Sequence, residues 1–296
     1  MKSTVTLTIV TPVYNGEKFM RQTIESVLSQ AGSFYIDYII VDDGSTDSSL
    51  EIIKDYANRL KENKWKIECL GIEFRYFTGP NQGQTKAYNK SFSAAHGQIM
   101  AWMNADDYYL PGALNEVAKL YESDPTIDFI YSKCLKLYES GNSFVERLTE
   151  PRPDETFDSL RTRGNSFDVC FFTKRIFDKV GPLDESLKYC MDLEFWFRVF
   201  AVGKIKYLPF ATVAYRLWSG ANTVKKQDGF ERERIYIAKK YGGNVIPAKK
   251  IYKIRGKLKI LNTLQQKFPS TYNKLKIYFY KTIDIFKYKS THKQNV

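Results

Sequence analysis

Residues 98–114 read QIMAWMNADDYYLPGAL, an apolar run that stops at two adjacent acids. The apolar run at 99–103 predicts a buried β-strand, which ends directly in the polar sequence NADD at 104–107. Adjacent carboxylates at the end of a buried strand repel each other, and they are unfavourable there unless a positive group lies beside them. Two positive partners fit the sequence: the N-terminus of a helix opened by YYLPGAL, or a divalent cation.

Strand-like and helix-like patterns alternate through the first 125 residues. Runs typical of strands occur at 5–10, 37–43, 72–77 and 98–103, and helical spacing of apolar residues occurs at 17–30, 47–60, 85–95 and 112–123. This alternation predicts a mostly parallel sheet with helices on both faces. Sheets of that kind bind ligands at the carboxyl ends of their strands.

Three polar sequences follow predicted strands: TPVYNG at 11–16, DDGSTD at 42–47 and NADD at 104–107. Each has a local explanation, because Asn-Gly and Asp-Gly are turn signals and Ser, Thr and Asp cap helices. Tyr14 fits either a core position or a position that stacks on a base. Because the carboxyl ends of parallel strands meet at one edge of a sheet, the three sequences together favour a binding site there.

Beyond residue 125 the alternation weakens. Residues 128–138 and 204–218 predict extended strands, 165–181 a strand followed by a helix, and 191–203 an apolar helix. From Gly229 onward the pattern is helical and basic, with breaks near Pro247 and Pro269. We therefore expect an α/β domain with a basic helical extension at its C-terminal end.

The net charge of +12 is concentrated at one end of the chain. Residues 239–296 contain 14 Lys and one Arg against a single acid, which gives +14 and leaves −2 for the preceding residues. Such a segment suits an anionic lipid surface, nucleic acid or an acidic partner. Apolar residues at helical spacing among lysines at 245–290 are typical of a helix on a membrane surface. A subdomain packed on the catalytic body and a dimerisation element are the alternatives.

Cysteine spacing and hydropathy exclude other classes. The four cysteines form no CxxC pair, so we expect reduced, mostly buried thiols. No window holds the roughly 18 apolar residues that span a bilayer, and the N-terminal apolar run is too short for a signal peptide. We therefore expect a cytoplasmic protein, which a lipid-binding tail would make peripheral on the inner face of the cell membrane.

Four segments together resemble the family 2 glycosyltransferases, which are inverting enzymes of the GT-A type. They read TIVTPVYNG, YIIVDDGSTDSS, GPNQGQTKAYNKSFSAAHGQIMAWMNADDYYLPGAL and GPLDESLKYCMDLEFWFRV, and the resemblance covers about residues 4–220. It implies a Rossmann-like GT-A catalytic domain at 1–225, with a nucleotide-sugar half at about 1–110 and an acceptor half at about 111–225. A basic amphipathic helical tail at 226–296 would follow.

The resemblance also implies roles for single residues. Pro12 and Tyr14 match positions that line the base and ribose pocket, and Asp43 matches the acid that reads a uracil or thymine base. Asn104-Ala105-Asp106 occupies the family's DxD place, so Asp106 is the implied ligand of Mn²⁺ or Mg²⁺, and Asn104 replaces the first Asp. The complete implied donor site is Pro12, Tyr14, Asp43, Asn81, Gln84, Lys86, Asn104 and Asp106, supported by Thr11, Asp42 and Asp107.

CMDLEFW at 190–196 resembles the motif that carries the family's general base. Asp192 matches the base and Glu194 is the alternative, although Asp192 also fits an acid that caps the helix 193–202. There is one departure from the family pattern. Members often carry a His after YR near the end of the domain, which can touch the metal or the diphosphate, and here YRLWSGANT has Trp218 in that place.

The implied activity is inverting transfer of a sugar from a nucleotide-diphosphate donor, with UDP- or dTDP-sugars favoured, to an acceptor hydroxyl. A glycan or lipid-linked acceptor in bacterial polysaccharide, lipopolysaccharide or other cell-surface glycan synthesis is expected, and loops such as 140–165 would sense the donor sugar. One alternative is an inactive nucleotide-sugar-binding module on the same fold. Another is a nucleotidyltransferase, but TPVYNGEKF lacks the Gly-rich basic phosphate loop of that class. Nucleic-acid binding is disfavoured because no recognised module accompanies the charge.

Overall fold

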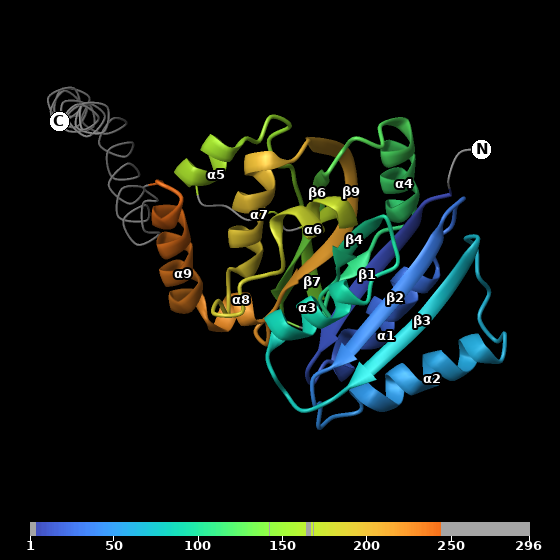
Figure 1. Ribbon diagram of the computed structural model, residues 1–296. Helices are drawn as coiled ribbons and strands as arrows, with labels where there is room; N and C mark the ends of the chain where they lie inside the picture. Colours follow the sequence, from blue (N-terminus) through green and yellow to red (C-terminus); the bar gives the residue numbers. More distant parts are fainter. Residues whose placement is uncertain (1–3, 142, 164–166, 168, 244–296) are drawn as a thin grey trace, which may run out of the picture. The chain divides into compact units, whose positions relative to one another are not determined.

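The computed structural model describes residues 4–141, 143–163, 167 and 169–243. They belong to a compact unit that spans residues 1–245, and the predicted membrane-binding segment at 245–290 lies outside them. Figure 1 shows a twisted sheet in this unit with helices on both of its faces. The predicted α/β class is therefore confirmed.

A nine-stranded sheet runs through the described residues in the order β3-β2-β1-β4-β8-β6-β9-β5, with β7 paired to β6. The strands are β1 (Thr6–Val13), β2 (Tyr35–Asp42), β3 (Gly71–Thr78), β4 (Ile99–Trp102), β5 (Tyr108–Tyr109), β6 (Phe129–Ser140), β7 (Ser143–Thr149), β8 (Cys170–Thr173) and β9 (Ile205–Leu217). Pairs among β1 to β4 and the pair β6–β9 are parallel. The pairs that involve β5, β7 and β8 are antiparallel.

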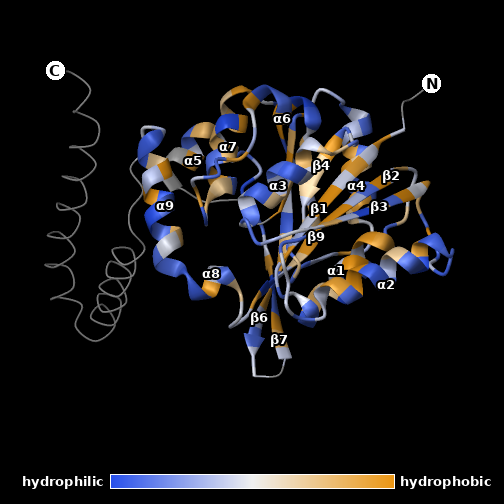
Figure 2. Cartoon of the chain, turned by 60° about the horizontal axis from the view of Figure 1, so that its bottom comes forward, coloured by the Kyte–Doolittle hydropathy of each residue, from blue (hydrophilic) through white to orange (hydrophobic). Residues whose placement is uncertain are grey.

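Helices cover both faces of the sheet, which explains the almost unbroken apolar sequences of β1 and β2. Buried residues of α1 (Glu17–Leu28), α2 (Ser49–Lys61) and α4 (Ala113–Ser123) form one core cluster with Ile9. Those of α3 (Gln84–Ser93), α6 (Lys174–Val180) and α7 (Met191–Val202) form a second cluster with Val10. Successive strand residues face opposite sides. Figure 2 shows hydrophobic strands between helices that carry hydrophilic residues on part of their surface.

Three further helices lie in the second half of the described chain: α5 (Phe157–Arg163), α8 (Asn222–Lys225) and α9 (Gln227–Lys240). Ile237 of α9 is fully buried in the same core cluster as α7. The predicted division at residue 225 falls between α8 and α9 and stays a prediction. The described part of the following segment nevertheless packs on the predicted catalytic domain.

The carboxyl end of β1 extends further than its apolar run predicts and includes Pro12. β1 lies between β2 and β4, but β4 ends its pairing at Val10, whose carbonyl accepts the Met103 N–H at 2.8 Å. In a strand, residues two apart direct their backbone groups to the same side. Pro12 therefore lacks its N–H on the side where β4 has already ended, so no ladder hydrogen bond is lost.

The structure corrects two expectations. NADD does not cap a helix, because α4 begins only at Ala113, after the short strand β5. The region 140–165 is not a simple loop, since it contains β7, which forms a hairpin with β6, and the whole of α5. Consequently, the acids at 104–107 need a partner other than a helix N-terminus.

Candidate active site

A cavity of about 690 Å³ lies at the carboxyl ends of β1, β2 and β4. The three polar sequences predicted to converge do meet there. The cavity is also lined from α7, β9 and the α8 region. The predicted site residues that line it are Pro12, Tyr14, Asp43, Asn81, Gln84, Asn104, Asp106 and Asp192.

Asp43 joins the end of β2 to the loop before α3. Its two carboxylate oxygens accept hydrogen bonds from the backbone N–H groups of Gln82 at 2.8 Å and Gly83 at 3.0 Å. Gly83 has φ +94°, a conformation that favours glycine. A carboxylate offers about four acceptor positions, so Asp43 retains capacity to accept from a ligand in the cavity. Nearby, Tyr14 is 55% exposed and lines the cavity.

The cavity lining does not include two supporting residues, Thr11 and Asp42, or the predicted donor-site residue Lys86. Thr11 is buried, and its hydroxyl lies 3.2 Å from the hydroxyl of Tyr38. Asp42 is buried and accepts the Ser45 N–H at 3.3 Å. Lys86 is exposed on α3, and the cavity lining does not include it. Thr11 and Asp42 therefore stabilise the ends of β1 and β2 through these hydrogen bonds and do not contact a ligand in the cavity.

Arg216 of β9 is the positive group beside Asp107. Asp107 is buried and accepts the Arg216 backbone N–H at 2.8 Å and the Asn104 amide at 2.8 Å. The Arg216 guanidinium donates to the Asp106 carbonyl and to the Gln22 side chain. Burial, together with the charge of Asp106, raises the pKa of Asp107 well above its usual range, and the Arg216 contacts oppose this. Asp107 thus holds the turn at 104–107 against β9 and does not line the cavity.

Asp106 turns toward the cavity, and its Oδ2 accepts a hydrogen bond from the indole Nε1–H of Trp218 at 2.8 Å. Asn104 lines the same wall, and its Oδ1 accepts the Tyr88 hydroxyl at 3.2 Å. Carboxylate and amide oxygens are hard ligands of the type that Mg²⁺ and Mn²⁺ take. The donor set around Asp106 therefore fits the predicted cation, with Asp106 as its charged ligand.

Asp192 lies in the first turn of α7, is half-buried and lines the cavity. Its Oδ1 accepts the Leu193 N–H at 2.7 Å. The preceding loop is held by Glu233 of α9, which accepts the backbone N–H groups of Lys188, Tyr189 and Cys190 at 2.8–3.0 Å. The position of Asp192 therefore depends on α9 as well as on α7.

Glu194, the alternative base, does not line the cavity. It is buried and accepts hydrogen bonds from Arg198, Lys240 and Tyr241 at 2.7–2.9 Å. Burial alone would raise its pKa, but the hydrogen bonds from Tyr241 and Lys240 and the charge of Arg198 hold it below the usual value. The structure therefore gives Glu194 a part in joining α7 to α9, and we do not propose it as a base.

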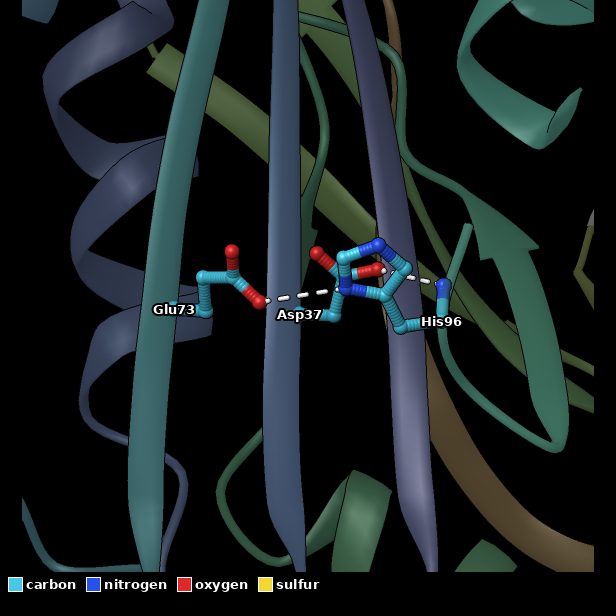
Figure 3. Close-up of side chains that lie close together, drawn as sticks. All are labelled: Asp37, Glu73 and His96. Carbon is cyan, nitrogen blue, oxygen red and sulfur yellow. Dashed lines mark hydrogen bonds and ion pairs between the residues drawn. The ribbon is translucent and has the colours of Figure 1, made fainter. Parts of the chain in front are cut away.

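Figure 3 shows a second group of ionisable side chains, Asp37, Glu73 and His96, whose ligand atoms lie within 4.8 Å of one another. The carboxylate of Asp37 is already occupied, because it accepts from Thr8 Oγ1 at 2.8 Å, the His96 backbone N–H at 3.0 Å and the Arg75 guanidinium. Asp37 precedes Asp42 by five residues on β2, which is roughly 16 Å along a strand. We interpret this group as an ion cluster of the sheet, remote from the cavity.

With this geometry established, comparison with known proteins defines the class. Residues 8–180 match the model of glycosyl transferase family 2, and the chain therefore belongs to that family. An uncharacterized glycosyltransferase of Rickettsia typhi is 27% identical over 209 residues, which are 67% of this chain. The chain spans 60% of the length of that relative.

Solved structures share the fold. TarS from S. aureus, residues 1–349 in complex with UDP-GlcNAc, has a TM-score of 0.61 at 18% identity over 83% of this chain and 69% of that 1–349 chain. The mannosyltransferase PcManGT from Pyrobaculum calidifontis, in complex with GDP-Man and Mn²⁺, has a TM-score of 0.53 at 16% identity over 74% of this chain and 59% of its own. These likenesses confirm the predicted GT-A fold.

The sequence did not assign Arg216 or Glu233 to the site, and it marked Trp218 only as the residue that stands in the place of the family's His. Arg216 and Trp218 follow Asp106 by more than a hundred residues, so spacing alone did not predict that they contact it. The motif YRLW does place an arginine and an indole at a strand end. Glu233 belongs to a segment that the sequence pattern assigns to the tail, so its contact with the loop before Asp192 was not predictable.

Proposed function

We propose that the protein transfers a sugar from a UDP- or dTDP-sugar to an acceptor hydroxyl with inversion of the anomeric centre. The observation that carries this proposal is the cavity itself. It brings together Asp43, Asp106 and Asp192 from three separate elements. No two of them are adjacent in sequence. Their proposed roles differ: Asp43 in base recognition, Asp106 in cation binding and Asp192 in proton abstraction.

The donor half is formed by the ends of β1, β2 and β4. Tyr14 offers an exposed ring for stacking on a base, and Asp43 offers acceptor capacity for the imide N–H of uracil or thymine. Gln84 and Asn81 line the wall that leads to the diphosphate position. The UDP-GlcNAc and GDP-Man complexes of the structurally similar proteins support a nucleotide-sugar donor, although they differ in the base.

The diphosphate leaves with developing negative charge. A divalent cation held by Asp106, with Asn104 beside it, would supply Lewis-acid stabilisation of that charge when bound. Arg216 and Asp107 hold the backbone of this turn in place. The Mn²⁺ in the PcManGT complex supports Mn²⁺ as the ion to test first.

Asp192 is the proposed general base. The acceptor O–H bond breaks and its proton moves to the Asp192 carboxylate, while the acceptor oxygen forms a bond to the anomeric carbon. The bond between that carbon and the phosphate oxygen breaks, and its electron pair leaves with the nucleoside diphosphate. A single displacement of this kind inverts the centre and needs no covalent enzyme intermediate.

The acceptor is proposed to be a glycan or a lipid-linked hydroxyl in cell-surface glycan synthesis. Among the described residues, no helix is long and apolar enough to cross a bilayer. We propose that the 245–290 segment attaches the protein to anionic lipid at the inner face of the cell membrane. Flotation of the full chain with anionic but not with neutral vesicles is the expected result, and equal flotation with both contradicts the proposal.

The alternatives are an inactive nucleotide-sugar-binding module and a nucleotidyltransferase. The test is Mn²⁺-dependent binding and hydrolysis across a panel of nucleotide sugars on wild type, Asp106→Ala and Asp192→Asn. We expect one donor to bind with metal, Asp106→Ala to abolish that binding, and Asp192→Asn to bind the donor without hydrolysing it. Failure of every nucleotide sugar to bind contradicts the proposal, and binding without turnover in the wild type favours the inactive module.

A further inference from the structure

Trp218 is the first residue after β9, and its indole lies in the wall of the cavity beside Asp106. The Nε1–H donates to Asp106 Oδ2 at 2.8 Å. Among the described residues, this is the one hydrogen bond that the Asp106 carboxylate makes, and the Arg216 guanidinium holds the Asp106 carbonyl. Backbone and side chain of Asp106 are thus fixed from β9 and the residue that follows it.

The indole position is itself constrained from several sides. The Phe19 ring meets it edge to face with centroids 5.1 Å apart, and the Lys18 ammonium lies 4.6 Å from its centroid. The chain then turns back, with the Ala221 N–H donating to the Trp218 carbonyl at 3.0 Å. A Cβ atom on Gly220 would lie 2.0 Å from two ring carbons, so the ring packs directly on a residue that has no side chain. An indole held in this way is preorganised to donate to Asp106.

An indole N–H has no lone pair to offer, so Trp218 cannot itself ligate a cation. A carboxylate with one oxygen in a hydrogen bond can still bind a cation, and such outer hydrogen bonds orient the ligand. We propose that Trp218 is a positioning residue for metal binding, which holds the Asp106 carboxylate in place for the divalent cation. This inference rests on the proposed function, because it requires Asp106 to be the metal ligand.

A purely structural role for Trp218 makes the opposite prediction for two substitutions. Trp218→Phe keeps an aromatic ring against Phe19 but has no N–H donor. Trp218→His has a smaller ring but keeps an N–H. The second ring nitrogen of His can also ligate the cation, as the family's histidine can, so Trp218→Phe is the deciding variant. If the hydrogen bond matters, Trp218→Phe loses metal binding although it keeps the aromatic packing; if only packing matters, Trp218→Phe binds metal like the wild type.

The experiment titrates the full-length chain with Mn²⁺ at saturating UDP and measures free Mn²⁺ by electron paramagnetic resonance. Trp218→Phe should weaken Mn²⁺ binding about 10–100-fold, and Trp218→His should bind Mn²⁺ more tightly than Trp218→Phe. UDP binding in the absence of metal should be equal in all three proteins, which shows that the base and ribose contacts are intact. Asp106→Ala in the same titration marks complete loss of the site.

The outcomes distinguish the role of Trp218 from the metal-dependent function. Wild-type affinity in Trp218→Phe, together with loss in Asp106→Ala, overturns the role of Trp218 and leaves the proposed function standing. Weaker binding in Trp218→His than in Trp218→Phe also overturns it. A wild-type chain that takes up no Mn²⁺ with UDP present overturns the metal-dependent function and this inference together.

Discussion

The carboxylate of Glu233 in α9 accepts a 2.9 Å hydrogen bond from the backbone N–H of Cys190, two residues before Asp192. The same carboxylate accepts the N–H groups of Lys188 and Tyr189. A single side chain from the segment assigned to the tail thus satisfies three consecutive backbone donors of the loop that leads into α7. Helix α9 therefore helps to position Asp192, the proposed base, through Glu233.

Glu233→Gln is expected to impair transfer without impairing donor binding. An amide has one acceptor oxygen in place of two, so the loop loses hydrogen bonds, which costs about 1–3 kcal/mol of unfolding free energy. A small shift of Asp192 can lower kcat by up to about 100-fold. The measurements are kcat for transfer, the donor Kd and urea unfolding.

The exposed Glu51 on α2 offers the matched control, because Glu51→Gln makes the same chemical change away from the cavity. Glu51→Gln should leave all three quantities at wild-type values. Equal donor Kd and equal kcat in Glu233→Gln and wild type contradict a role for Glu233 in placing the base.

Glu194→Gln tests the ion cluster between α7 and α9. The pKa of Glu194 in the folded protein lies below its usual value, so its contribution to stability is present above the unfolded pKa of roughly 4.3 and is lost as the pH falls through the folded value. We expect the substitution to lower the unfolding free energy by about 1–3 kcal/mol near pH 7. Arg198 and Lys240 would be left with a neutral partner.

Urea unfolding of wild type and Glu194→Gln across acidic pH measures how the contribution of Glu194 to stability changes with pH. The difference in unfolding free energy between wild type and Glu194→Gln should shrink as the pH falls from about 6 to about 3. A difference that stays constant over this range contradicts an ionised, stabilising Glu194.

The sequence predicted the convergence of the three polar strand ends because each is encoded locally, by an apolar run that stops at a polar cluster. The hairpin partner β7 escaped prediction since most of its residues are exposed and its polar sequence SFVERLT shows no buried face. Contacts such as Arg216 with Asp106 escaped for another reason. They join residues that are distant in sequence. These residues come together only because β9 pairs with β5 in the sheet.

Gly220→Ala tests how firmly the indole of Trp218 is held. The added methyl group would lie 2.0 Å from ring carbons, so the ring must move away from its place against Asp106. Overpacking of this kind costs about 1–3 kcal/mol. We expect weaker Mn²⁺ binding at saturating UDP, with metal-free UDP binding unchanged; Gly79→Ala, where an added Cβ meets no atom within 4 Å, is the control.

Asp43→Asn tests whether this carboxylate reads the base. A carboxylate accepts from the imide N–H of uracil, whereas an amide can also donate, as cytosine requires. Loss of a hydrogen bond to a charged group costs about 1.5–3 kcal/mol, which corresponds to roughly 10–150-fold weaker UDP binding. CDP binding should change less, so the preference for UDP over CDP should narrow. Because Asp43 also holds the backbone of Gln82 and Gly83, loosening of that loop alone would weaken UDP and CDP equally, and that outcome would contradict base recognition by Asp43.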